Sequence, residues 1–181
     1  MKCEFCRKRD ASIKFPFNPV HFCDQCFQTF LEKKVLKNIR KNKLLKQSHI
    51  KISEEDKVEK KVLIHILLKY FSKSNKIELV PKEKENVNAK SVEECATEFL
   101  ESFLKGSETV SPPENNLLDG VSIYELIKYA ELEKITFNKP NFGKIYTMLK
   151  KISLNNPSIF FSIFQSGKKI KEKLEKEANN R

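Results

Sequence analysis

Four of the five cysteines in this chain form two pairs whose spacing is typical of metal-binding knuckles: Cys3 with Cys6, and Cys23 with Cys26. Residues 7–22 separate the pairs. Two CxxC pairs at this separation predict a closed tetrahedral Zn²⁺ site, with thiolates about 2.3 Å from the ion and no position left for water. Such a site is structural rather than catalytic. Redox thiols, or His21 in place of one cysteine, are the alternatives.

The residues after Cys26 predict a helix with one apolar and one basic face. An apolar stripe recurs every four positions, at Phe27, Leu31, Val35 and Ile39. Residues 33–46 contain seven basic residues and no acidic one. Because such a face can contact RNA phosphates, we expect RNA-binding residues here. They are Lys33, Lys34, Lys37, Arg40, Lys41 and Lys43. An ordinary solvated face is the alternative.

Composition sets limits on the class of protein. The chain has 181 residues and a net charge of +11, which suits one domain with a polyanionic partner. Lys, Asn, Ile and Phe are used heavily and there are only four glycines, as in proteins from AT-rich genomes. Such a bias would account for part of the positive charge without a polyanionic partner. No apolar run reaches the ~20 residues of a membrane span, and the start lacks the apolar region of a signal peptide. We therefore expect a cytoplasmic protein with reduced thiols.

The rest of the chain predicts a small amount of strand and much helix. Candidate strands are 50–52 and 76–80, and residues 107–116 read as a linker. Candidate helices are 53–71, 91–106, 122–135, 141–153, 157–165 and a charged helix after Gly167. Two of these helices open on capping motifs, Ser53 with Asp56 and Ser122 with Glu125. His65, within the second helix of the chain, is expected to be a core or boundary residue.

The turn at residues 53–56 lies where a nucleotide-binding α/β fold holds phosphate. A phosphate turn needs glycines, which let backbone N–H groups approach the oxygens at a helix N-terminus. This turn has Glu54, Glu55 and Asp56 instead. We therefore expect no ATP site on this chain.

Five segments resemble a known family. The N-terminal segments are KCEFC, FCDQCF and FLEKKVLKNIRKNKLL. They are similar to the start of the cytoplasmic tRNA 2-thiolation proteins, zinc-knuckle members of the PP-loop ATPase superfamily. Later segments similar to that family are SIYELIKYAELEKITF and NNPSIFFSIFQSGKKI. The match is specific over residues 3–45, moderate over 122–170 and topological between them.

The resemblance implies an α/β fold: a degenerate, truncated PP-loop (Rossmann-like) domain rich in helix, with an N-terminal four-cysteine zinc finger. It implies a zinc finger plus basic helix at 1–47, a PP-loop remnant at 48–110 and a C-terminal helical region at 111–181. The family's S-G-G-x-D-S motif falls on residues 53–58, where only Ser53 matches at the start. Of the extra cysteines that active members carry, only Cys95 remains, and we expect it to be a buried structural thiol.

The implied function is that of a non-catalytic subunit, closest to the Ncs-two type, in the 2-thiolation of the tRNA wobble uridine (U34). The partners would be tRNA, a catalytic subunit in a heterodimer and, indirectly, a ubiquitin-like sulfur carrier. Zinc would be the structural cofactor, with no ATP and no membrane contact. One alternative is a zinc-ribbon RNA- or ribosome-binding protein unrelated to thiolation. A working sulfurtransferase is the other, and it needs an ATP site and further reactive cysteines.

Overall fold

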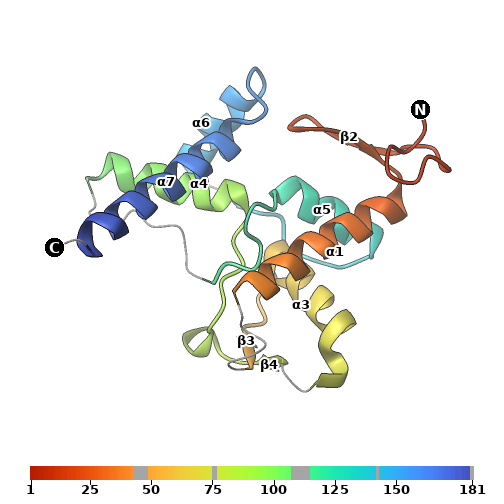
Figure 1. The fold of residues 1–181 in the computed structure, drawn as a ribbon, viewed down its shortest axis with the longest axis horizontal. Helices are drawn as coiled ribbons and strands as arrows, with labels where there is room; N and C mark the ends of the chain where they lie inside the picture. The colour runs from red at the N-terminus through yellow and green to blue at the C-terminus, as the bar shows by residue number, and fades with distance from the viewer. Residues whose placement is uncertain (43–48, 75–76, 107–114, 142, 180–181) are drawn as a thin grey trace.

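The computed structural model describes residues 1–42, 49–74, 77–106, 115–141 and 143–179. Over these residues six helices accompany two small sheets (Figure 1). The helices are α1 (Asp24–Lys41), α3 (Val58–Phe71), α4 (Val92–Leu104), α5 (Ile123–Leu132), α6 (Lys144–Ser153) and α7 (Ile159–Asn179). The strands are β1 (Ile13–Phe15), β2 (Asn18–Phe22), β3 (Ile50–Ile52) and β4 (Ile77–Leu79), and the short 3-10 helices are η1 (Ser72–Ser74) and η2 (Lys82–Lys84).

The N-terminal sheet is an antiparallel hairpin of β1 and β2, with Ile13 opposite Phe22. The chain passes from β2 directly into α1, so the hairpin stands at the N-terminal end of this long helix (Figure 1). The α1 stripe predicted from the sequence is confirmed, because Phe27, Leu31, Val35 and Ile39 are fully buried. Burial of this stripe is what fixes which face of α1 meets solvent.

The second sheet pairs β3 with β4 in parallel, in the register Ile50 opposite Ile77. The helix α3 connects the two strands, so β3, α3 and β4 form a βαβ unit. The α3 helix is central to the core, as expected, with Val62, Leu63 and Ile66 fully buried. One apolar cluster joins the hairpin, α1, β3, α3 and α5.

The sequence prediction for the start of α3 is wrong. The helix begins at Val58 with Lys57 as N-cap, and no side chain caps it. Ser53 is buried, and its hydroxyl donates to Glu55 and Glu85 instead of accepting from a backbone N–H of the helix. Residues 53–57 therefore form an extended turn between β3 and α3. At Ser122 the prediction holds, since a complete capping box with Glu125 opens α5.

A second apolar cluster lies between α4, α6 and α7, and it contains Cys95, Tyr146 and Phe164. The sequence predicted a break near Gly167, but α7 runs through it without interruption. A Cβ built on Gly167 would lie 2.7 Å from the Phe99 ring of α4. The glycine therefore permits close approach of two helices, and it does not end one. Phe103, near the C-terminal end of α4, is exposed.

None of the helices within the described residues combines the length and apolar character that crossing a bilayer requires. Most of the predicted linker at 107–116 lies outside the described residues, as does Lys43.

Candidate functional site

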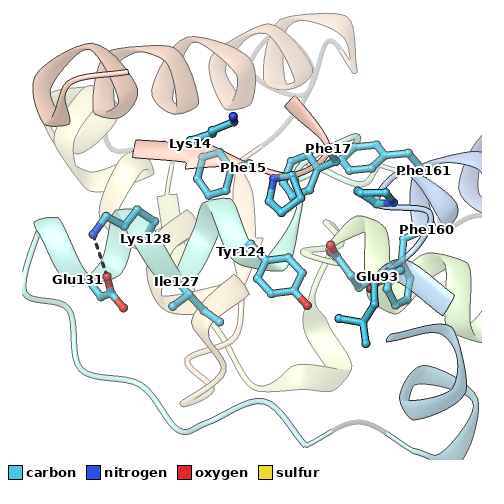
Figure 2. A pocket seen from close by; sticks show the side chains of 14 residues that line it. Lys14, Phe15, Phe17, Glu93, Tyr124, Ile127, Lys128, Glu131, Phe160 and Phe161 are labelled. Carbon is cyan, nitrogen blue, oxygen red and sulfur yellow. Dashed lines mark hydrogen bonds and ion pairs between the residues drawn. The ribbon is translucent and has the colours of Figure 1, made fainter. Parts of the chain in front are cut away.

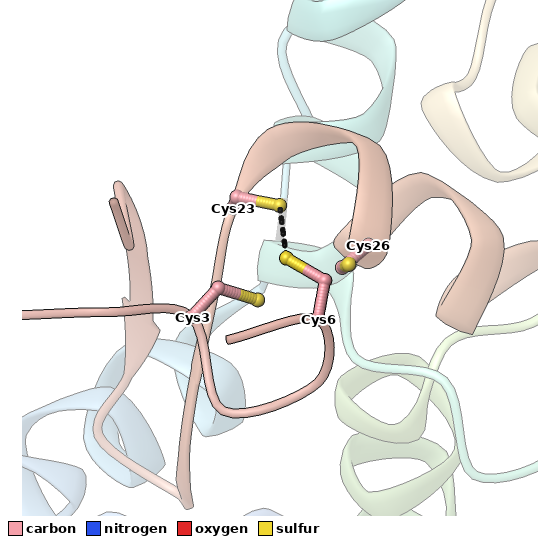
Figure 3. Close-up of side chains that lie close together, drawn as sticks. All are labelled: Cys3, Cys6, Cys23 and Cys26. Carbon is pink, nitrogen blue, oxygen red and sulfur yellow. Dashed lines mark hydrogen bonds between the residues drawn. The ribbon is translucent and has the colours of Figure 1, made fainter. Parts of the chain in front are cut away.

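The two cysteine pairs lie on different kinds of turn beside the hairpin (Figure 3). Cys3 and Cys6 belong to a tight turn in which the Arg7 N–H donates to the Cys3 carbonyl at 2.8 Å and Arg7 has a φ of 54°. Cys23 is the N-cap of α1, and Cys26 lies in its first turn. A tight turn and a helix start thus each direct two thiols at one point.

The separations of the sulfur atoms fit a single metal ion. All four Sγ atoms lie within 4.8 Å of one another, and those of Cys6 and Cys23 are 3.9 Å apart. Thiolates at about 2.3 Å from a tetrahedral Zn²⁺ are about 3.8 Å from each other. A cluster of four irons places each thiolate on a different iron, which requires more widely spaced sulfurs. The geometry therefore favours one ion. No disulfide competes for the four thiols, because all five cysteines are free.

The charges around the four thiols also suit a cation. The backbone N–H groups of Arg9 and Lys8 lower the pKa of Cys6 to about 6, while burial and the neighbouring thiols raise the pKa of Cys26 to about 12. Four thiols this close cannot all ionise without a compensating positive charge. The guanidinium of Arg9 supplies part of that charge, with Nη1 3.9 Å from the Cys23 Sγ.

His21 has another role than the metal ligand considered as an alternative. Its Nδ1 lies 2.8 Å from the Glu4 carboxylate, and its backbone N–H donates to the same oxygen at 3.1 Å. These contacts lower the pKa of Glu4. His21 thus fastens β2 to the first cysteine turn, and the cysteines alone form the convergent set in the described part of the chain.

The basic side of α1 is exposed where the sequence placed it, with one exception. Lys33, Lys37, Arg40 and Lys41 are exposed to solvent. The Lys34 ammonium instead lies 3.0 Å from Glu125, whose side chain is 1% exposed. Lys34 therefore neutralises a buried carboxylate at the start of α5. No local pattern reveals a pair separated by 91 positions, so the sequence carried no signal for it.

The turn between β3 and α3 already holds an anion, and sequence reasoning missed it. Glu85, which follows η2, accepts from the Ser53 backbone N–H at 2.6 Å, from the Ser53 hydroxyl and from the Lys60 ammonium. Burial opposes ionisation here, but these donors prevail and lower the pKa of Glu85. Glu54, which the sequence placed across the phosphate position, points outward and is 63% exposed. The carboxylate that occupies the turn comes from a distant segment.

An acidic cavity lies beside the same turn, at the N-terminal end of α3. It has a volume of 440 Å³, and its lining includes six acidic residues: Glu55, Asp56, Glu59, Glu94, Glu98 and Glu101. Burial and the nearby Glu59 raise the pKa of Glu94 to about 7. A cavity with this lining repels phosphate groups.

Cys95 and His65 agree with the roles expected from the sequence. Cys95 is 4% exposed, and burial raises its pKa to about 12, which is far from a reactive thiolate. The Asn116 amide lies 3.7 Å from its sulfur. His65 lies at the boundary of the core, edge-on to the Tyr129 ring and 3.5 Å from Glu133.

No protein-family model matches this sequence, and no curated protein sequence does either. Among solved structures, the U34-tRNA thiolase NcsA from Methanococcus maripaludis, solved with its [4Fe-4S] cluster, matches with a TM-score of 0.73. The match covers 95% of this chain and 87% of the thiolase chain at 12% sequence identity. This chain has the fold of that thiolase. The predicted fold class is confirmed: over the described residues the chain has a helix-rich α/β fold, like that of the PP-loop-like thiolase, with small sheets and an N-terminal four-cysteine cluster.

Proposed function

We propose that this chain is a non-catalytic, tRNA-binding subunit of a cytoplasmic complex that thiolates U34 of tRNA. The observation that carries the proposal is the shared fold, which extends over 95% of the chain to a U34-tRNA thiolase. The partner would be a catalytic thiolase that binds ATP and receives sulfur, ultimately from a ubiquitin-like carrier.

The β3–α3 turn supports the non-catalytic part of the proposal. A nucleotide phosphate at this turn would compete with Glu85 for Ser53 and Lys60, and it would face the acidic cavity at the start of α3. Both features oppose a triphosphate electrostatically. We therefore expect no measurable ATP binding by this chain alone. Isothermal calorimetry that detects micromolar ATP affinity, lost when this turn is mutated, would contradict the proposal.

The cysteine inventory supports the same conclusion. If the N-terminal four hold a structural Zn²⁺, the sequence leaves one cysteine, Cys95, and it is buried. A single thiol cannot hold an iron–sulfur cluster, and a thiol with a raised pKa is a poor sulfur carrier. Metal analysis of the reduced, unchelated protein should find about one Zn²⁺ per chain at this closed four-thiolate site. An iron–sulfur absorption spectrum would contradict it.

The basic residues predicted from the sequence in and just after α1 are the proposed tRNA contact. The set is Lys33, Lys34, Lys37, Arg40, Lys41 and Lys43, of which Lys34 is half-buried against Glu125. Because phosphate contacts release counterions, the log–log slope of affinity against salt should be roughly −3 if about four phosphates are neutralised.

The test replaces Lys33, Lys37, Arg40 and Lys41 with Glu. This variant should lose tRNA binding yet keep its zinc content and fold, because the four side chains lie opposite the buried stripe. A matched control replaces four exposed lysines outside α1, namely Lys73, Lys82, Lys84 and Lys105. Equal tRNA affinity of the two variants would show that the α1 face has no special role.

The role in thiolation is tested by affinity purification of the chain from its native cells. A PP-loop thiolase should co-purify, and thiolated U34 should decline in cells that carry the α1 variant. RNA or ribosomes without a thiolase would instead favour a zinc-ribbon RNA-binding protein outside this pathway.

A further inference from the structure

A second candidate site lies away from the cysteines and from the β3–α3 turn. It is a cavity of 470 Å³ between the tip of the β1–β2 hairpin, one side of α5 and the corner that joins α6 to α7 (Figure 2). Cavities of this size suit a small ligand or one flat ring system. Two prolines, Pro16 and Pro157, belong to its lining, so its rim is conformationally restricted on both sides.

Aromatic rings dominate the walls, and Phe17 is their centre. Its ring centroid lies 5.0 Å from that of Phe161 on α7, 5.4 Å from that of Phe15 and 6.4 Å from that of Tyr124 on α5. Phe17 is partly buried, and Tyr124 is 37% exposed (Figure 2). Rings from three separate parts of the chain thus present faces and edges to one solvent-accessible space. This arrangement favours a planar, aromatic occupant.

The positive charge near the cavity lies on its α6–α7 side. The lining itself is balanced, with Lys14 and Lys128 against Glu93 and Glu131, and Lys128 is paired with Glu131 at 3.2 Å. The α6–α7 wall belongs to residues 134–171, which contain eight lysines and no acidic residue. Lys144, Lys150 and Lys151 of α6 are exposed. The occupant should therefore combine a flat ring with negative charge close by, as a nucleotide of an RNA strand does.

We propose that this cavity receives one unstacked base of a single-stranded RNA segment. The base stacks on Phe17 and Tyr124, while Lys14 and the α6 lysines meet the phosphates on either side. The proposal rests on the RNA-binding role proposed above and adds a second contact to it. Backbone phosphates meet α1, and one base enters between the hairpin and the C-terminal helices.

The experiment measures binding of a fluorescent oligouridine and of an abasic oligonucleotide of the same length to the full chain. Stacking of one base should make the oligouridine bind about tenfold more tightly than the abasic strand. Tyr124→Ala should abolish this difference, whereas Tyr124→Phe, the matched control, retains the ring and should preserve it. Equal affinity of wild-type protein for the two strands overturns the proposal.

Phe17→Leu separates an RNA base from a protein side chain as the occupant. Leucine keeps apolar bulk but lacks the π-face, so affinity for oligouridine should fall while zinc content and thermal unfolding stay close to wild type. Unchanged RNA affinity together with loss of a co-purified protein would overturn the proposal in favour of protein docking. The base-dependent difference is measured without a thiolase, so failure of co-purification tests the thiolation role separately.

Discussion

The cysteine cluster and the β3–α3 turn are both built at the start of a helix, yet they differ in what their polar groups can still do. At α1, the N-cap Cys23 and first-turn Cys26 converge with Cys3 and Cys6 on one point. At α3, the donors of the preceding turn are already bound by Glu85. The first arrangement needs an external cation to balance its thiolates. The second is balanced by the chain itself.

The comparison shows that the shape of a helix start does not decide whether it binds a ligand. The β3–α3–β4 unit keeps the strand–turn–helix geometry that holds phosphate in related folds. An external anion at this turn would have to displace Glu85, which belongs to the same chain and is therefore always present at the site. The shape of the turn alone does not reveal this occupancy.

Loss of the metal should produce the largest effect. Binding of structural Zn²⁺ contributes on the order of 10 kcal/mol to the folding of such segments. We expect Cys23→Ser to lose the metal and to unfold the hairpin and first turn of α1, measured by zinc content and circular dichroism. The matched control is Cys95→Ser, which makes the same substitution outside the cluster and should keep the metal. Full zinc occupancy in Cys23→Ser would show that the cluster does not need all four thiolates to hold the ion.

Removal of Glu32, which links α1 to α3 and α5, should give the next largest effect. Glu32 of α1 accepts from Lys69 and Tyr70 of α3 and from Tyr129 of α5, the first and last at 2.7 Å. Glu32→Ala leaves three donors without their acceptor, so we expect a loss of about 3 kcal/mol in the free energy of unfolding.

Glu131→Ala, at an exposed carboxylate of α5, is the matched control for that change. Urea unfolding of both variants measures the difference. Equal stability of the Glu32 and Glu131 variants would mean that apolar packing alone holds α1 against α3 and α5.

Removal of Glu85 tests the occupied turn directly. Glu85→Ala removes the acceptor of the Ser53 backbone N–H and of the buried Lys60 ammonium, which should cost about 2 kcal/mol of stability. Inorganic phosphate should restore part of the melting temperature in this variant but not in the wild type. Glu83→Ala, at an exposed residue of η2, controls for the lost charge. No rescue by phosphate would show that the turn is not an anion site even when Glu85 is absent.

The acidic cavity should give an effect of opposite sign, which appears only as the pH rises. Because the pKa of Glu94 is raised from 4.5 to about 7, the stability that its neutral form contributes is complete below pH 4.5 and is lost as the pH rises through about 7. Glu94→Gln should therefore match the wild type near pH 4 and exceed it by about 3 kcal/mol at pH 7.5.

Melting curves across this pH range check the Glu94 prediction. Glu98→Gln, on the same helix but 46% exposed, should change little. A gain of stability for Glu94→Gln that is independent of pH would contradict burial as the cause.

Local patterns were sufficient for much of this fold. The spacing of the cysteines, the four-residue stripe of α1 and the capping box at Ser122 depend on neighbours within a few positions, and the structure contains all three. The start of α3 was misplaced because Ser53 has a stronger partner than its own helix. That partner is 32 positions away, so no window of sequence contains it.

Residues that depend on tertiary contacts could not be assigned from the sequence. In the sequence Lys34 does not differ from the other lysines of α1, and only its 3.0 Å contact with the buried Glu125 gives it a different role. Gly167 looked like a helix end, because glycine disfavours helices unless close packing requires it. The cavity beside Phe17 is formed by four segments that are separated in the sequence, and aromatic residues alone do not predict it.

The contact between Gly167 and Phe99 also limits how this sequence can change over evolutionary time. The α4 and α7 helices meet with no side chain of position 167 between them, and a single added carbon would lie 2.7 Å from the ring. A larger residue at 167 is therefore tolerable only after the residue at 99 has become smaller. In descendants of this chain the two positions should covary, and that pair would mark distant relatives whose overall identity is too low to detect.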